Sequence, residues 1–174
     1  MVFRRIYTLI KEFIMLKVRD AMKRFILAFG AVCLILTSVL MFAQTAARYI
    51  FHYSFYWSDE LARYAIIWGA QLCAAVGVSE RTHTALDFLA SKLPSIVHSI
   101  VNLLLDVLYM FFSAALFYYS FSNISLGMKS VSAGLGLPMG YVYAALTVSM
   151  VCTIIFLLFN IAEDLKLLTK PKEV

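Results

Sequence analysis

Three charged side chains stand directly before one apolar stretch and are the first candidates for chemistry. The segment FYWSDELARYAIIWGAQ, residues 55–71, carries Asp59, Glu60 and Arg63 ahead of a long uncharged run. Two neighbouring carboxylates could act as an acid–base pair, lie on a proton path, or form the polar end of a surface that binds another protein. In the simpler alternative, both acids lie in the first turn of a helix as caps, and Glu60 pairs with Arg63 at i, i+3.

Asp106 is the second candidate, because it is the only carboxylate deep inside an apolar segment. His98, Asn102 and Asp106 lie at four-residue intervals on one helix face, which Ser113 and Ser120 continue. At 1.5 Å per residue, Asp106 is expected roughly 15 Å from the inner end of its helix and so near the bilayer midplane. The stripe could be a proton relay or a polar seam bonded to a neighbouring helix or another subunit, and we favour the seam.

Other catalytic and cofactor-binding patterns are missing from the sequence. It has no GxSxG motif and no glycine-rich loop of the phosphate-binding type. Only His98 lies near an apolar segment, whereas a b-type haem needs two imidazoles that face each other across a bundle. We therefore predict that the protein is not an enzyme and binds no cofactor or metal. A disulfide framework or zinc site is not expected either, because all three cysteines lie within apolar runs and form no CxxC pair: Cys33, Cys73 and Cys152.

These side chains must be positioned by membrane-spanning helices. The chain has 174 residues, of which 63% are hydrophobic and 14% charged, and its mean hydropathy is +0.86. The second apolar run, Tyr64 to Val78, is only roughly 22 Å long as a helix, so we expect this helix to begin earlier, with Ser58 as its N-cap. The predicted fold is an all-α integral membrane protein with four transmembrane helices, because about 20 apolar residues cross a bilayer. The other three apolar segments lie at about residues 25–43, 95–124 and 141–160.

The basic residues indicate the orientation of the four helices in the membrane. With the N-terminus inside, the cytoplasmic segments hold twelve Lys and Arg residues, and the outer segments hold three, Arg48, Arg63 and Lys129. Because cytoplasmic loops are enriched in basic residues, both termini are expected in the cytoplasm. Topology and lipid headgroups thus explain the net charge of +5, and no nucleic acid partner is expected.

Two further segments have amphipathic patterns. Residues 3–16 carry apolar side chains on one helical face and polar ones opposite, which is typical of a helix lying along the inner membrane surface. Residues 82–94 begin with a capping-box-like pattern and have leucines along one face. The predicted organisation is an interfacial N-terminal segment, 1–23, a transmembrane domain, 24–162, and a cytoplasmic tail, 163–174.

The second span also carries a ridge of small residues. Small residues allow two helix backbones to approach closely, so the ridge is predicted to pack against another helix or another subunit. The polar stripe of the third span, from His98 to Asp106, is assigned to the same kind of interface. The ridge residues recur at three- and four-residue spacing: Ala62, Ala65, Gly69, Cys73 and Gly77.

Three short motifs follow one another in a specific order along the chain. They are Trp57, Asp59, Glu60, Leu61 and Arg63 before the second span, with Trp68 inside it; His83 and Asp87 after it; and Gly136, Leu137, Pro138 and Tyr143 at the fourth span. In this order and spacing the sequence resembles the small membrane subunit of tripartite ATP-independent periplasmic (TRAP) transporters, the DctQ-like family. The resemblance covers about residues 20–168 and includes the layout of four spans with both ends inside.

The resemblance implies an accessory subunit in the bacterial inner membrane. In such systems a larger membrane subunit holds the substrate and sodium sites, and a periplasmic solute-binding protein delivers an organic acid. A C4-dicarboxylate, sialic acid or a sugar acid would fit this class. The small subunit braces the large one and widens its anchor among the membrane lipids.

The residues themselves are consistent with this role. The sequence has one deep carboxylate and no ion-ligating cluster, so a transport site of its own is not expected. The alternative is a self-sufficient proton-coupled exporter of four helices that uses Asp106. The charged outer rim, surrounded by aromatic residues, is suited to docking of the binding protein, and its predicted contact residues are Arg48, Trp57, Asp59, Glu60 and Arg63.

Overall fold

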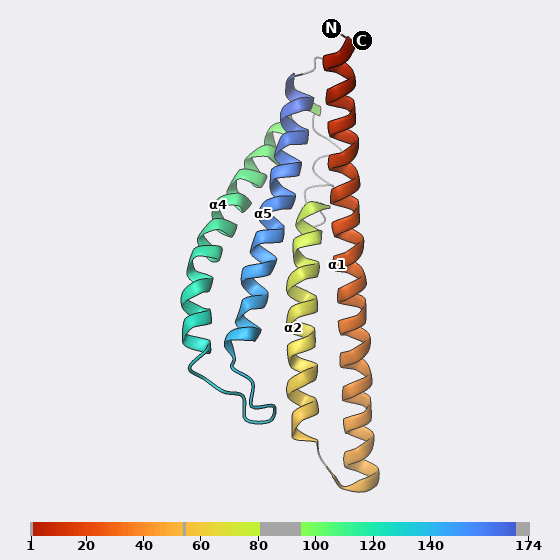
Figure 1. The fold of residues 1–174 in the computed structure, drawn as a ribbon, viewed down its shortest axis with the longest axis vertical. Coiled ribbons are helices and arrows are strands. Elements are labelled where there is room, and N and C mark those ends of the chain that lie inside the picture. The colour runs from red at the N-terminus through yellow and green to blue at the C-terminus, as the bar shows by residue number, and fades with distance from the viewer. Residues whose placement is uncertain (1, 54, 81–94, 170–174) are drawn as a thin grey trace.

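Four long helices make up the described part of the chain (Figure 1). The computed structural model describes residues 2–53, 55–80 and 95–169, and it places side chains in 16–53, 55–80 and 100–165. All four helices are long and apolar enough to cross a bilayer, which confirms the predicted all-α membrane fold. The helices are α1, Val2–Phe51; α2, Tyr56–Ser79; α4, Ser95–Gly127; and α5, Gly140–Thr169.

α1 is longer than the sequence pattern predicted. We expected a separate amphipathic helix over residues 3–16, but the backbone runs without a break from Val2 to Phe51. The physical reason is that no proline or glycine lies between residues 2 and 29, so nothing ends the helix before the apolar span. The chain reverses at His52, whose φ of 54° lies in the left-handed region. The location of residues 1–23 at the membrane surface stays a prediction.

α2 begins two residues before the predicted N-cap. Phe55 is the N-cap residue, and Ser58 lies inside the first turn, where its hydroxyl lies 2.9 Å from the Phe55 carbonyl oxygen and 3.2 Å from Gln44 Oε1. The Ser58 prediction was wrong because this side chain is buried against α1 and does not cap the helix. The resulting 24-residue helix is about 36 Å long, which is sufficient to cross the membrane. The second predicted amphipathic segment, 82–94, lies outside the described residues.

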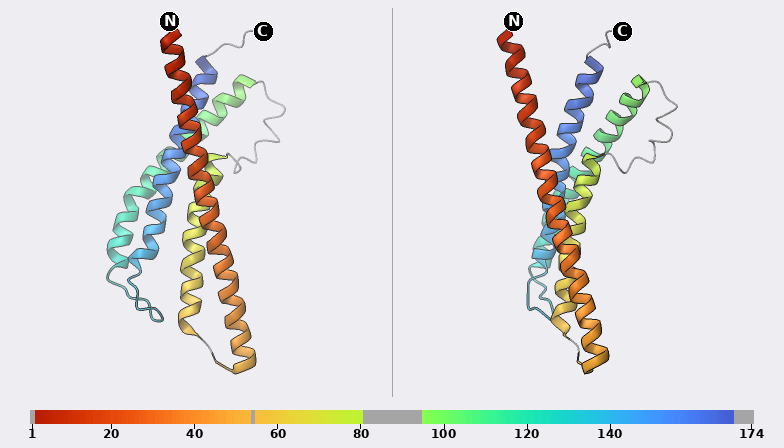
Figure 2. Two further views of the ribbon diagram at one scale, coloured as in Figure 1. Left: turned by 45° about the vertical axis from the view of Figure 1, so that its right-hand side comes forward. Right: turned by 90° about the vertical axis from the view of Figure 1, so that its right-hand side faces the viewer.

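The helices lie in an open row and not in a closed bundle. Among the described residues, extended contacts join α1 to α2, α2 to α5, and α5 to α4, and Figure 1 shows this order across the molecule. Toward the end where α1 begins and α5 ends, the helices diverge (Figure 2). We call this end the inner end and the opposite end the outer end, following the orientation indicated by the basic residues.

The apolar core lies where α1, α2 and α5 meet. It contains Ile26, Leu72, Ala75, Val76 and Phe156, and the motif residue Trp68 packs against it. Much of the remaining apolar surface is exposed along the row, because each helix has at most two extensive neighbours. Phe42 of α1 is 78% exposed and Phe111 of α4 is 76% exposed.

Candidate functional site

The Glu60 carboxylate binds the loop between α4 and α5 at the outer end. Glu60 Oε1 accepts a hydrogen bond from the Gly134 amide at 3.0 Å, and Oε2 accepts one from the Leu135 amide at 3.0 Å. The hydroxyl of the buried Ser132 also donates to Oε2. The carboxylate therefore has three donors from a segment more than seventy residues away in sequence.

Asp59 and Arg63 form the solvent-facing charges of the same helix turn. Arg63 Nη2 lies 3.2 Å from Asp59 Oδ2, at i, i+4, and both side chains are well exposed to solvent. The simpler alternative paired Glu60 with Arg63, but Arg63 pairs with Asp59 and the Glu60 carboxylate faces the α4–α5 loop. The two acids of this turn thus have different environments: one is bound by backbone amides and one is open to solvent.

The remaining predicted rim residues lie at the tip of the first hairpin. Arg48 is exposed in the last turn of α1, where a positive charge complements the helix dipole. Trp57 is 45% exposed, and its ring stacks edge-on against Phe55, which in turn contacts Tyr53. All five predicted docking residues therefore lie at one end of the molecule, although Glu60 faces the neighbouring loop.

The small residues of α2 lie at the crossing with α1. A Cβ atom added to Gly69 would lie 2.9 Å from Cys33 Cβ, and one added to Gly30 would collide with Cys73 Sγ. Nearer the outer end, Thr37 Oγ1 donates to the Ala62 carbonyl at 3.2 Å. Ala62 and Gly69 are buried; Ala65, Cys73 and Gly77 are half-buried. The two backbones thus approach each other so closely that any larger side chain at Gly30 or Gly69 would push them apart.

The polar stripe of α4 is buried along the seam with α5. Asn102, Asp106, Ser113 and Ser120 are each at most 7% exposed. Thr147 of α5 donates to Ser120 Oγ at 2.8 Å, and this contact sets the register of the two antiparallel helices. The side chain of His98 is not among those that the structure describes. The stripe therefore faces another helix of the same chain over this length.

This register relates the position of Asp106 to the inner end of α2. From the Ser120–Thr147 contact, Asp106 is about 21 Å along α4 and Asn160 is about 20 Å along α5, so the two are nearly level. The Asn160 amide donates to the Val78 carbonyl in the last turn of α2 at 3.4 Å. Asp106 therefore lies level with the inner end of α2, because α4 extends past α2 at this end. The depth of Asp106 in the bilayer stays a prediction.

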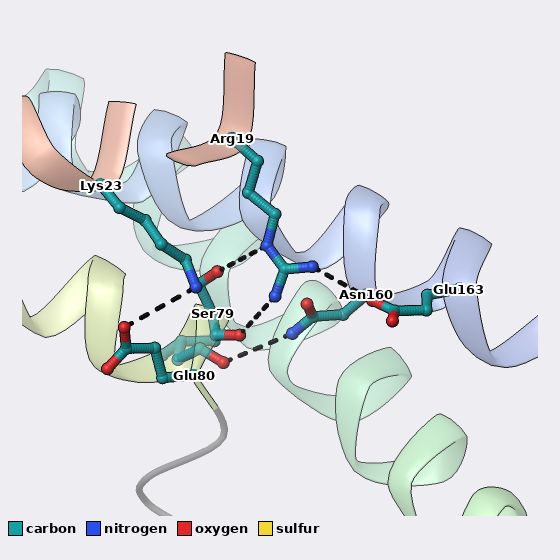
Figure 3. A network of polar contacts seen from close by, with 7 residues as sticks. Arg19, Lys23, Ser79, Glu80, Asn160 and Glu163 are labelled. Carbon is teal, nitrogen blue, oxygen red and sulfur yellow. Dashed lines mark hydrogen bonds and ion pairs between the residues drawn. The ribbon is translucent and has the colours of Figure 1, made fainter. Parts of the chain in front are cut away.

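A second polar cluster at the inner end was missed by the sequence analysis (Figure 3). The Arg19 guanidinium of α1 donates to the Ser79 carbonyl of α2 at 3.0 Å and lies 3.1 Å from Glu163 Oε2 of α5. Lys23 lies 3.8 Å from Glu80, just past the end of α2. Both cations were interpreted only as indicators of topology, but their i, i+4 spacing could have shown that they share one helix face.

Comparisons with known proteins identify a family and several proteins that are similar to this chain. A family model described as "Tripartite ATP-independent periplasmic transporters, DctQ component" matches residues 37–167. A TRAP transporter small permease protein of Haemophilus influenzae is 29% identical over 112 residues, which cover 64% of this chain and 70% of that protein.

Two longer permease proteins are also similar to this chain. The sialic acid TRAP transporter permease protein SiaT of Haemophilus influenzae is 26% identical over 113 residues, 63% of this chain. The isethionate TRAP transporter permease protein DctMQ of Oleidesulfovibrio alaskensis is 27% identical over 132 residues, 71% of this chain. The matches span only 18% and 21% of the lengths of these two relatives.

Proposed function

We propose a bracing role for this chain, which belongs to the DctQ component family of tripartite ATP-independent periplasmic transporters. It is a small, multi-pass membrane subunit of a transporter in the inner membrane and not an enzyme. In the proposed role the four helices stay fixed beside a larger membrane subunit, which carries the substrate. The chain supports that subunit within the bilayer.

The open row of helices is the observation that carries this proposal. Among the described residues each helix makes extensive contacts with at most two others, so many large apolar side chains along the row are exposed and available to a neighbour in the membrane. The longer relatives support the idea of a large neighbour, because the segment similar to this chain makes up about a fifth of each. In those proteins one permease chain contains both this segment and much additional sequence.

The environment of Asp106 favours bracing over the alternative of a proton-coupled exporter. An exporter would need this carboxylate in a cavity that the transported solute can reach. Asp106 is instead 5% exposed, on a stripe that packs against α5 beside other buried polar side chains.

We further propose that the complete transporter takes up an organic acid with sodium and receives it from a periplasmic binding protein. The names of two relatives mention sialic acid and isethionate, which are both organic anions. C4-dicarboxylates and sugar acids belong to the same chemical class. The outer rim, with the exposed Asp59–Arg63 pair, is the proposed contact surface for the binding protein.

Reconstitution into liposomes tests the proposal. The chain would be purified in mild detergent from its own membrane, and the proteins that accompany it would be identified. We expect a large multi-span subunit, and we expect solute uptake only when this subunit, the present chain and the binding protein are all supplied. Uptake or export by the present chain alone would contradict the bracing role.

A further inference from the structure

The loop between α4 and α5 has the features of a carboxylate-binding site. Two successive amides, those of Gly134 and Leu135, point at the two oxygens of one carboxylate, and the Ser132 hydroxyl adds a third donor. Adjacent amides that converge in a turn form a concave site for anions. In this structure the site is filled by the side chain of Glu60, which comes from a different helix.

The local sequence explains why the loop can surround a carboxylate. A Cβ atom added to Gly134 would lie 3.0 Å from Glu60 Cδ and 3.2 Å from the Tyr56 carbonyl oxygen, so a larger residue here would require the Glu60 side chain or α2 to shift slightly. Gly136 has a φ of 66°, which other L residues rarely adopt. Both glycines therefore favour the turn that aims the amides.

The loop is also braced by hydrogen bonds that do not involve Glu60. The Ser132 amide donates to the Leu137 carbonyl at 2.9 Å, and the Gly136 amide donates to the Ser132 carbonyl at 3.1 Å. The Met139 amide donates to the Ser130 carbonyl at 2.9 Å. These bonds hold the turn in shape from within, so the carboxylate enters a site that is largely preorganised.

We propose that residues 132–136 form a carboxylate-binding loop, that Glu60 is its resident ligand, and that this contact fixes the α4–α5 loop to α2 as one rigid outer surface. We call this contact between Glu60 and residues 132–136 the latch. Glu60 is then a positioning residue and not a docking charge. Asp59 and Arg63 remain the charges that face solvent. The consequence for docking rests on the proposed function, whereas the carboxylate site itself does not.

Chemical rescue tests the carboxylate site directly. Truncation of Glu60 in Glu60→Ala removes the same atoms that an acetate ion supplies, namely a carboxylate and one further carbon. Hydrogen–deuterium exchange of the peptide that covers 132–136 would be measured on the full chain, purified with its membrane partner. We expect Glu60→Ala to accelerate this exchange about tenfold, because hydrogen bonds to a charged group are lost. Acetate, but not acetamide or chloride at equal concentration, should restore protection.

Two matched variants complete the experiment. Asp59→Asn alters the neighbouring carboxylate without touching the loop and should leave the exchange unchanged. Glu60→Gln keeps one acceptor oxygen but turns an amino group toward an amide donor, so it should accelerate exchange and show no rescue by acetate. Unchanged exchange in Glu60→Ala would overturn the latch. Faster exchange that acetate does not reverse would overturn the assignment of the loop as a carboxylate site.

Uptake measurements separate this inference from the proposed function. If the binding protein docks on the outer surface, Glu60→Ala should raise the binding-protein concentration that gives half-maximal uptake, and acetate should lower it again. A rescue of exchange without any effect on uptake would retain the latch and reject its role in docking. A change in uptake without a change in exchange would reject the latch.

Discussion

The Arg19 guanidinium of α1 caps the C-terminal end of α2 through Ser79. Arg19 Nη2 donates to the Ser79 carbonyl at 3.0 Å, and Nε lies 3.4 Å from Ser79 Oγ, although the residues are sixty positions apart. The last carbonyls of a helix have no partner within it, and a cation there also complements the helix dipole. Because Arg19 also pairs with Glu163, one side chain joins α1, α2 and α5 at the inner end (Figure 3).

Loss of this side chain is predicted to loosen the inner end. Arg19→Ala leaves the buried Ser79 without its donors and should cost about 1–3 kcal/mol of stability, the usual penalty for a buried polar group left without a partner. Thermal unfolding of the purified chain in detergent would show a lower Tm. Lys23→Ala is the matched control, because its pair with the half-exposed Glu80 is worth at most about 1 kcal/mol. Equal effects of the two variants would contradict the capping role of Arg19.

The crossing of α1 and α2 leads to a second prediction. Gly69→Leu places a branched side chain against Cys33 and should separate the helices, at a cost of about 1–3 kcal/mol or more. Ala70→Leu is the control, since Ala70 is the next residue in the same helix and is exposed. Thermal stability and co-purification with the large subunit would be measured for both. Intact stability in Gly69→Leu would show that the close approach is not required.

A third prediction concerns Asp106. If the α4 stripe is a structural seam, Asp106→Asn keeps the shape and hydrogen-bonding capacity of the side chain and should leave uptake by the assembled transporter within about twofold. If the chain were a proton-coupled exporter, the same change would abolish transport because no titratable group would remain at this position. Transport assays in liposomes with the complete complex, and with the chain alone, would distinguish the two. Loss of transport with normal assembly would contradict the seam.

The sequence was sufficient to predict the features that depend on local patterns. Runs of apolar residues predicted four spans, and the family motifs predicted the DctQ family. Contacts between distant segments were not predicted, since periodicity within one helix contains no information about its neighbours. The pairs Glu60–Ser132 and Arg19–Ser79 are examples, and so is the start of α2, where Ser58 bonds toward α1. The level of Asp106 relative to α2 could not be predicted for the same reason: it depends on how far α4 extends past α2.

The last prediction tests the outer surface without disturbing the fold. The double variant Asp59→Arg, Arg63→Asp swaps the two charges: it preserves an i, i+4 ion pair in α2 but reverses its direction. If this pair helps to steer the binding protein, the double variant should reduce uptake several-fold when the binding protein is limiting and the salt concentration is low. The reduction should become smaller at higher salt, because salt screens the charges. Assembly with the large subunit should be normal, because neither residue binds the α4–α5 loop. Uptake equal to that of the unaltered protein at limiting binding protein would show that these two charges only stabilise the first turns of α2.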